Sequence, residues 1–356
     1  MGHVTGVAGG AARRPGGASA WASVASPEGA APGPQSEGVA GYLFAFFAGD
    51  HEPHGEEVRF ALSAGADPLH WRTLPGLGTL ASTIGTRGVR DPFLIRLSDD
   101  EGFALLGTDL RVYASGDWDA AARHGSRDML VWRSDDLISW GAPQAVTMMP
   151  AEAGCVWAPE AVHDPATGEH LVFWASTLYD PQDLHHAGES YHRMMAGRTR
   201  DFRTFSPPTV WADAGTATID STVVQDDAGL FYRFTKDERK EDGDYAGFVF
   251  SERSANLAAT RWEPVARDLG RSRAGRPGLR RAEGPIVVRE PGGDGWLLFL
   301  DEFGHRGYLP LRADRLDSAH WTLVEDHALP PEECRHGSIM ALTAAEYARL
   351  VMLTTD

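Results

Sequence analysis

The stretch Gly88-Val89-Arg90-Asp91-Pro92-Phe93-Leu94-Ile95 decides the fold, because it sets one carboxylate at the mouth of an apolar, β-prone run. Four later stretches copy this arrangement, and each is entered through one ionisable residue: Glu160, Asp220, Glu283 and His336. The five ionisable residues follow one another at intervals of 69, 60, 63 and 53 residues. A repeat of this size predicts supersecondary units arranged around an axis.

Two further series keep the same spacing. The first is a second strand-like run in each unit, at residues 42–47, 103–107, 170–175, 230–235 and 296–301. The other is a strand, a polar turn and a second strand that opens on an aromatic residue, at residues 58–71, 129–140, 195–205, 248–262 and 308–321. Five units of four short antiparallel strands predict an all-β fold, a five-bladed β-propeller.

The order of the series predicts how the ring closes. The chain begins with the second-strand and third-strand runs at Tyr42 and Val58, whereas the last inner-strand run, around His336, has no partners after it. The N-terminal strands should therefore complete the blade that the C-terminal strand opens. This closure would leave no inner edge strand unpaired.

Composition agrees with a single large β domain and narrows the class of ligand. The chain has 356 residues, 42% hydrophobic content, 40 Gly and 11 Trp, as expected where many turns join strands that bury aromatic side chains. Its formal net charge of −17 argues against a nucleic-acid partner, whose phosphates require Lys and Arg. No apolar run is long enough to predict a membrane span.

The termini and the cysteines add three expectations. Residues 1–39 are rich in Gly, Ala and Pro and show no periodicity, which predicts a disordered tail ahead of a propeller catalytic domain at residues 40–356. Arg13-Arg14 is not followed by the apolar stretch of an export signal, which slightly favours the cytoplasm over secretion. Cys155 and Cys334 fall on blades that are not neighbours, which predicts two buried thiols and no disulfide.

The inner strands of a propeller converge on its axis, so Asp91, Glu160, Asp220, Glu283 and His336 should ring one end of the central channel. Gathering four carboxylates and an imidazole raises the pKa values of the carboxyl groups, which marks functional sites. The alternatives are that each residue caps its own strand, or that the ring holds a structural cation. Hydrolysis of a glycosidic bond suits the cluster, since it needs one protonated carboxylic acid and one carboxylate.

Five motifs in order carry a resemblance to a known family. They are Val-Arg-Asp-Pro-Phe at 89–93, Trp-Ala-Pro-Glu at 157–160, Ile-Asp-Ser-Thr at 219–222, Glu-Gly-Pro at 283–285 and Arg-His-Gly at 335–337. Over about residues 41–352 the chain resembles glycoside hydrolase family 43, the five-bladed propeller glycosidases that act with inversion, mainly on arabinose- and xylose-containing glycans.

The resemblance implies a role for each ring residue. Asp91 matches the general base, Asp220 the carboxylate that tunes and orients the acid, and Glu283 the general acid. His336 matches an axial histidine that faces a water or a calcium ion, so a structural calcium in the channel is an expectation, and no cofactor is required. Glu160 matches a position without a proton-transfer role and is predicted to bind substrate.

Four more residues are predicted to bind substrate, each with an alternative. Trp157 could stack on a sugar or pack in the core. Lys236 could bond sugar hydroxyls or belong to a solvated charge run. Arg90 and Arg335 each precede a ring residue, and could offset its charge or pair on the surface.

These observations predict an exo-acting, inverting glycoside hydrolase that releases a terminal furanose from an oligosaccharide or polysaccharide. The joined motifs resemble the branch that acts on α-L-arabinofuranosides or β-D-galactofuranosides, which is analogy rather than physics. A β-xylosidase-type activity and a non-catalytic glycan-binding propeller are the alternatives.

Overall fold

The computed structural model describes residues 38–97, 101–241, 244–245, 247–273, 277–293, 295–330 and 334–354. The predicted tail, residues 1–39, lies outside these ranges except for its last two residues. No helix among the described residues is long and apolar enough to cross a membrane.

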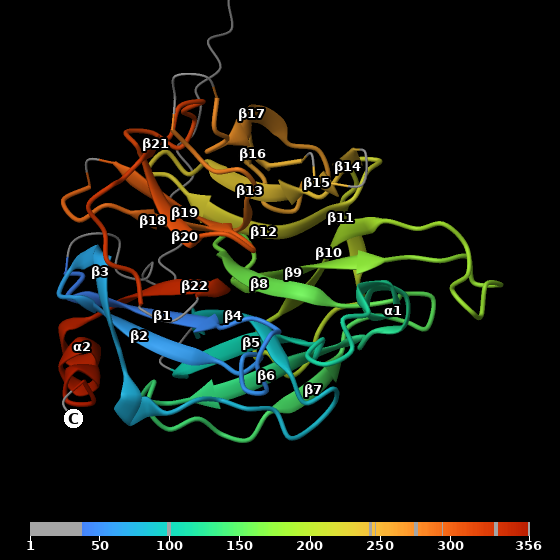
Figure 1. Cartoon of the computed structure of the whole chain (residues 1–356), viewed down its shortest axis with the longest axis horizontal. Helices are drawn as coiled ribbons and strands as arrows, with labels where there is room; N and C mark the ends of the chain where they lie inside the picture. The colour runs from blue at the N-terminus through green and yellow to red at the C-terminus, as the bar shows by residue number, and fades with distance from the viewer. Residues whose placement is uncertain are drawn as a thin grey trace, which may run out of the picture. The chain divides into compact units, whose positions relative to one another are not determined.

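Five four-stranded antiparallel sheets form the blades of a five-bladed β-propeller, which confirms the predicted fold (Figure 1). Blade one contains β4 (Val89–Arg96), β5 (Phe103–Asp109), β6 (Asp128–Ser134) and β7 (Gln144–Thr147). Blade two contains β8 (Trp157–Asp164), β9 (Glu169–Thr177), β10 (His192–Thr199) and β11 (Thr209–Ala212). Blade three contains β12 (Thr218–Gln225), β13 (Phe231–Asp237), β16 (Val249–Ser254) and β17 (Glu263–Leu269). Blade four contains β18 (Glu283–Arg289), β19 (Trp296–Glu302), β20 (Gly307–Ala313) and β21 (Thr322–Leu323).

Blade five joins the two ends of the described chain. Its strands run in the order β22 (Arg335–Leu342), β1 (Gly41–Phe47), β2 (Arg59–Ala64) and β3 (Asp67–Thr73), so the N-terminal strands complete the C-terminal blade as predicted. The inner strands β4, β8, β12, β18 and β22 contact one another in a closed cycle. Ser338 of β22 reinforces the closure, because its hydroxyl donates to the Pro92 carbonyl and accepts from the Leu94 amide of β4.

The remaining elements lie at the periphery. They are the 3-10 turn η1 (Pro75–Leu77), the helices α1 (Trp118–His124) and α2 (Ala344–Val351), and the ribbon of β14 (Lys240–Glu241) and β15 (Asp244–Tyr245). Helix α2 begins with a capping box between Thr343 and Glu346 and packs on β1 and β22. Helix α1 lies beside β9 of blade two, in the long connection between β5 and β6 (Figure 1).

The core is divided among the blade interfaces. Each of the five hydrophobic clusters of described residues joins two neighbouring blades, for example Leu43 and Leu62 of blade five with Leu105 and Trp132 of blade one. The predicted aromatic residues stand at the outer strands: Trp262 and Trp321 directly precede β17 and β21, and Trp71 lies within β3. Cys155 and Cys334 are buried and form no disulfide, as expected.

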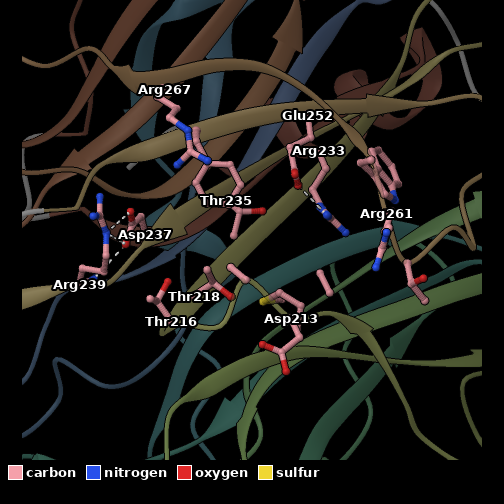
Figure 2. A pocket seen from close by; sticks show the side chains of 16 residues that line it. Asp213, Thr216, Thr218, Arg233, Thr235, Asp237, Arg239, Glu252, Arg261 and Arg267 are labelled. Carbon is pink, nitrogen blue, oxygen red and sulfur yellow. Dashed lines mark hydrogen bonds and ion pairs between the residues drawn. The ribbon is translucent and has the colours of Figure 1, made fainter.

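Between blades two and three the surface is hollowed into a cavity of about 450 Å³, whose walls come from β10, β11, β12, β13, β16, β17 and the loops around them (Figure 2).

Candidate active site

Every inner strand carries a β-bulge near its entry, and the bulge sets the level at which each ionisable residue stands. In β4 and β22 the bulged residues include Asp91 and His336, and in β12 the bulged residue is Asp220. Glu283 pairs with Asp301 just before the bulge of β18, and Glu160 pairs with Phe173 just after the bulge of β8. The expectation that all five stand at one level is therefore wrong: they occupy three successive levels along the channel.

Asp91, Asp220 and His336 form the centre of the cluster. The Nδ1 atom of His336 lies 3.3 Å from Oδ1 of Asp91 and 3.5 Å from Oδ2 of Asp220. Both aspartates have a left-handed backbone, with φ of 51° and 50°. Such a conformation is costly for residues with a Cβ and is held at functional sites by the surrounding fold. The bulges thus turn two carboxylates from different blades toward one imidazole.

The three members of this cluster differ in their pKa values and hence in their protonation states. Burial favours a neutral Asp91, but the hydrogen bond and charge of His336, with help from Arg90 and Thr108, hold the pKa of Asp91 below its ordinary value. Burial raises the pKa of Asp220 to about 7, and Glu283 and Asp91 add to this while His336 opposes it. Burial disfavours the charged imidazole, yet Asp220 and Asp91 raise the pKa of His336 to about 10. Near neutral pH, Asp91 is a carboxylate beside an imidazolium.

Two neighbouring groups fix the aspartates. The Thr108 hydroxyl donates to Asp91 Oδ2 at 2.7 Å and accepts from the Ala158 amide at 2.8 Å, which ties blade one to blade two. Oδ2 of Asp220 accepts from the amide of Gly284 at 3.2 Å. Asp220 therefore holds the backbone directly after Glu283.

Glu283 belongs to an ion-pair chain at the outermost level. Nη2 of Arg335 donates to Glu283 Oε1 at 2.8 Å, and Nε of Arg335 donates to Asp301 Oδ2 at 2.7 Å. The Glu283 side chain keeps 19% of its surface exposed, whereas Asp301 is fully buried. Burial raises the pKa of Asp301 to about 6 against the opposing charge of Arg335. Arg335 is thus an internal ion-pair partner and not a surface residue.

Glu160 and Lys236 are more deeply buried than Glu283. Burial raises the pKa of Glu160 to about 8, against the charge of His336 and a hydrogen bond from Thr222, so this carboxyl group is neutral at pH 7. The side chain of Lys236 is fully buried, with its Nζ 5.0 Å from the centre of the Phe303 ring, which excludes a solvated charge run. Burial lowers the pKa of Lys236, while Glu283, Glu238 and Asp220 oppose the effect.

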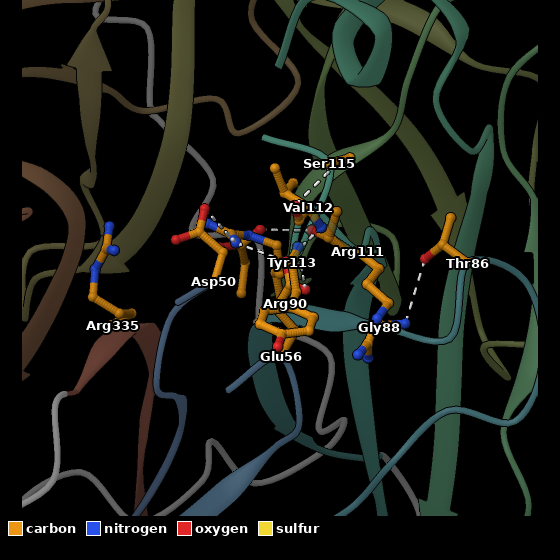
Figure 3. A network of polar contacts seen from close by, with 12 residues as sticks. Asp50, Glu56, Thr86, Gly88, Arg90, Arg111, Val112, Tyr113, Ser115 and Arg335 are labelled. Atoms are coloured by element: carbon orange, nitrogen blue, oxygen red, sulfur yellow. Dashed lines mark hydrogen bonds and ion pairs between the residues drawn. The ribbon is translucent and has the colours of Figure 1, made fainter. Parts of the chain in front are cut away.

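Arg90 is also internal. Its Nη1 donates to Glu56 Oε1 at 3.0 Å and lies 3.8 Å from Asp50 (Figure 3), and its guanidinium stacks 4.5 Å from the centre of the Phe47 ring. Glu56 also accepts the amides of Val112 and Tyr113. The alternative that Arg90 pairs on the surface is therefore excluded, and this network anchors the connection that leads to α1.

Trp157 lies beside Trp118, an aromatic residue that the sequence did not single out. Its ring lies 4.6 Å from that of His192 and meets the ring of Trp118 edge-on at 6.1 Å. Trp118 is 43% exposed and also lies over Arg90, at 4.8 Å. Trp118, at the start of α1, thus presents an aromatic surface next to Arg90, the residue that precedes Asp91.

The residues around His336 do not fit a directly bound calcium ion. Calcium is bound by oxygen ligands, whereas His336 is an imidazolium whose Nδ1 faces Asp91 and Asp220. Within the described ranges, no group of three or more His, Cys, Asp or Glu residues is arranged to hold a metal ion.

Sequence reasoning missed Thr108 and Asp301. Thr108 pairs with Arg90 and Asp301 with Glu283, and Lys236 holds the equivalent place opposite Ile219. Each is the next-to-last residue of the second strand of its blade, directly opposite the entry of an inner strand. The signal was a polar residue near the end of these three apolar second-strand runs, which the repeat had already located.

The comparisons with known proteins identify the family of the chain. A family 43-related model, described as "Probable glycosyl hydrolase domain", matches residues 37–348. The chain belongs to the family 43-related glycosyl hydrolases. Members of this glycosidase family act on carbohydrates.

One curated relative and two solved structures are similar to this chain. An α-L-arabinofuranosidase of Bifidobacterium longum subsp. longum is 30% identical over 310 residues, which are 79% of this chain. The match spans only 28% of the length of that curated relative. An α-L-arabinofuranosidase mutant from Fusarium graminearum, solved with an iminosugar inhibitor, aligns with a TM-score of 0.51 at 16% identity and covers 81% of this chain and 79% of its own. A thermostable family-43 glycoside hydrolase aligns with a TM-score of 0.48 at 14% identity, over 70% and 76% of the two chains.

Proposed function

We propose that this protein is an exo-acting, inverting glycoside hydrolase that removes terminal α-L-arabinofuranose from a glycan. One observation carries the proposal. Around His336, the carboxylate of Asp91 is kept ionised, whereas the pKa values of Asp220 and Glu160 are raised so that these carboxyl groups hold protons near neutral pH. The sugar is inferred from the arabinofuranosidase of Bifidobacterium longum, which is 30% identical. β-D-galactofuranose, whose ring geometry is similar, is the second candidate.

Asp91 is the proposed general base. A base that activates water must be ionised and held in position, and Asp91 is kept ionised by His336 and oriented by the Thr108 hydroxyl. The water would take its place on the side of the sugar ring opposite the leaving oxygen. Its attack on the anomeric carbon would invert the configuration, as it does when two carboxyl groups flank the scissile bond about 6.5–9.5 Å apart.

Glu283 is the proposed general acid. It stands at the most exposed level of the cluster, where a leaving oxygen can reach it, and Arg335 holds one of its oxygens. Asp220 fixes the Gly284 amide, and its own pKa of about 7 keeps a proton in the cluster at neutral pH. Asp220 therefore acts as a positioning residue for the acid.

The test is hydrolysis of four para-nitrophenyl glycosides: α-L-arabinofuranoside, β-D-galactofuranoside, β-D-xylopyranoside and α-L-arabinopyranoside. We expect release from the α-L-arabinofuranoside, with Asp91→Asn reducing kcat about 100-fold or more while sugar binding persists. Release from the β-D-galactofuranoside instead would replace the sugar but keep the mechanism. A folded protein that hydrolyses none of the four would contradict the proposed activity.

The stereochemistry is tested separately by proton NMR of the first sugar released. An inverting enzyme yields β-arabinofuranose from the α-linked substrate before mutarotation. First release of the α-anomer would contradict the assignment of Asp91 as a base and favour a covalent intermediate.

A further inference from the structure

The cavity between blades two and three is lined by side chains that have no place in the proposed reaction (Figure 2). Its wall includes four arginines, at positions 233, 239, 261 and 267. Such a gathering of guanidinium groups is unexpected in a chain with a formal net charge of −17.

Arg233 forms the floor of this cavity. Its guanidinium lies against both Trp211 and Trp262, at 4.4 and 4.6 Å from the ring centres, and its side chain is only 3% exposed. Nη2 donates to Glu252 at 2.6 Å, whereas the buried Nη1 has no hydrogen-bond partner among the described residues. Leaving a buried donor without a hydrogen bond is unfavourable, so a ligand atom that accepts from it would be stabilised.

The acidic residues of the cavity already have partners. Asp213 accepts from Tyr191 and Arg193, and Asp237 accepts from Arg239. Arg261 and Arg267 are exposed at the rim, and neither has a carboxylate partner within the described part of the chain. Figure 2 shows the guanidinium groups of Arg233 and Arg261 directed into the same cavity. The cavity is therefore left with positive charge that no acidic residue offsets.

The other lining groups indicate the chemistry of the ligand. Thr216 and Thr260 offer hydroxyls at the rim, and Phe250 and Trp262 offer aromatic surface. Guanidinium groups bind carboxylates with matched geometry, while hydroxyls and aromatic faces suit a sugar ring. We propose that this cavity binds an acidic sugar, through its carboxylate at Arg233 and Arg261, as a distal unit of the glycan substrate.

The location of the cavity supports this assignment, which rests on the proposed function. Thr218 of its wall lies in the inner strand β12, two residues before Asp220, and a strand rises about 3.3 Å per residue. Asp237 of the wall follows Lys236 directly. A glycan with its terminal furanose at Asp91 and Asp220 could thus extend into the cavity.

The experiment measures binding rather than hydrolysis. Methyl β-D-glucuronide, methyl β-D-glucoside and inorganic phosphate are titrated by calorimetry into the full chain and into the double variant Arg261→Gln/Arg267→Gln. The control is Arg203→Gln, which removes an exposed arginine from the loop after β10, outside the cavity. We expect glucuronide binding that weakens at least 10-fold in the double variant and is unchanged in the control.

The comparison of ligands decides the class. Binding of the glucuronide with no measurable binding of the glucoside or of phosphate supports the proposal. Equal binding of phosphate, equal binding of the glucoside, or no loss in the double variant overturns it. Hydrolysis of the small aryl furanoside should be the same in all variants, so failure of the acidic-sugar site is distinguishable from failure of the proposed catalysis.

Discussion

The Nδ1 atom of His336 lies 3.3 Å from Oδ1 of Asp91. The two residues come from the inner strands of blades five and one, which are neighbours only because the ring closes. A cation at this distance stabilises the carboxylate, which keeps the proposed base ionised despite its burial. The closure of the propeller thus determines the ionisation of a proposed catalytic group.

Replacing His336 should move the acidic limb of the pH profile. In His336→Gln the imidazolium is lost, the pKa of Asp91 rises, and the acidic limb of kcat/KM should shift to higher pH. The measurement is kcat/KM for an aryl arabinofuranoside between pH 3 and 9. An unchanged acidic limb in a folded variant would show that Asp91 is not the group that titrates there.

Glu283→Gln should affect substrates according to their leaving groups. The variant cannot donate a proton, so hydrolysis of glycans with poor leaving groups should fall about 100- to 10,000-fold. An activated aryl glycoside leaves without a proton and should retain much of its rate. Parallel kinetics on an arabino-oligosaccharide and on the para-nitrophenyl glycoside provide the test, and an equal loss on both would contradict the acid assignment.

Removing Arg335 should destabilise the fold through Asp301. Arg335→Gln leaves the buried Asp301 carboxylate without its guanidinium, at an expected cost of about 3–5 kcal/mol in the free energy of unfolding at pH 8. Adding Asp301→Asn removes the stranded charge and should recover part of the loss. Urea unfolding of the two single variants and the double variant measures the coupling; purely additive losses would rule it out.

Glu160→Gln should change how stability depends on pH. The pKa of Glu160 is raised from 4.5 to about 8 in the folded protein, so its contribution is fully present below pH 4.5 and is lost as the pH rises through 8. The variant mimics the protonated form, and its unfolding temperature should differ least from that of the wild type at pH 5, where little of the contribution has been lost. At pH 9 it should unfold at a higher temperature, by at least about 2 °C.

The same change at the exposed Glu325 is the control for that measurement, since it should leave the melting temperature unaltered at both values of pH. Calorimetry at pH 5, 7 and 9 gives the comparison. A constant difference between the Glu160→Gln variant and the wild type across this range would mean that Glu160 does not titrate on unfolding.

The repeat predicted the architecture because a propeller blade is a local unit. Blades one to four each form from a single stretch of the chain, and the spacing from Asp91 to His336 reports the number of blades. Even the closure of blade five could be read from the order of the strand series. The same repeat led to Asp91, Asp220 and His336. In the structure, a carboxylate oxygen of each aspartate lies within 3.5 Å of Nδ1 of His336.

The environments of the site residues could not be read in this way. The sequence around Lys236 was as compatible with a solvated loop as with a binding site. Only the structure shows that Lys236 pairs with Ile219 and that its side chain is buried. Arg90 and Arg335 were thought able to pair on the surface, but their partners Glu56 and Asp301 come from other strands or loops. Each arginine is separated from its partner by 34 residues in the sequence, so the pairing depends on how the strands pack.

The sequence by itself determined the number of blades, the way the ring closes and the identities of the clustered ionisable residues, because hydrophobic periodicity and motif order are properties of the chain alone. Only the tertiary structure decided the levels of Glu160 and Glu283, the protonation of each group and the charge of the cavity at Arg233. The physical reason is that a β-bulge shifts a side chain along and around its strand. Burial and the field of neighbouring charges then act over distances that exist only once the blades have packed.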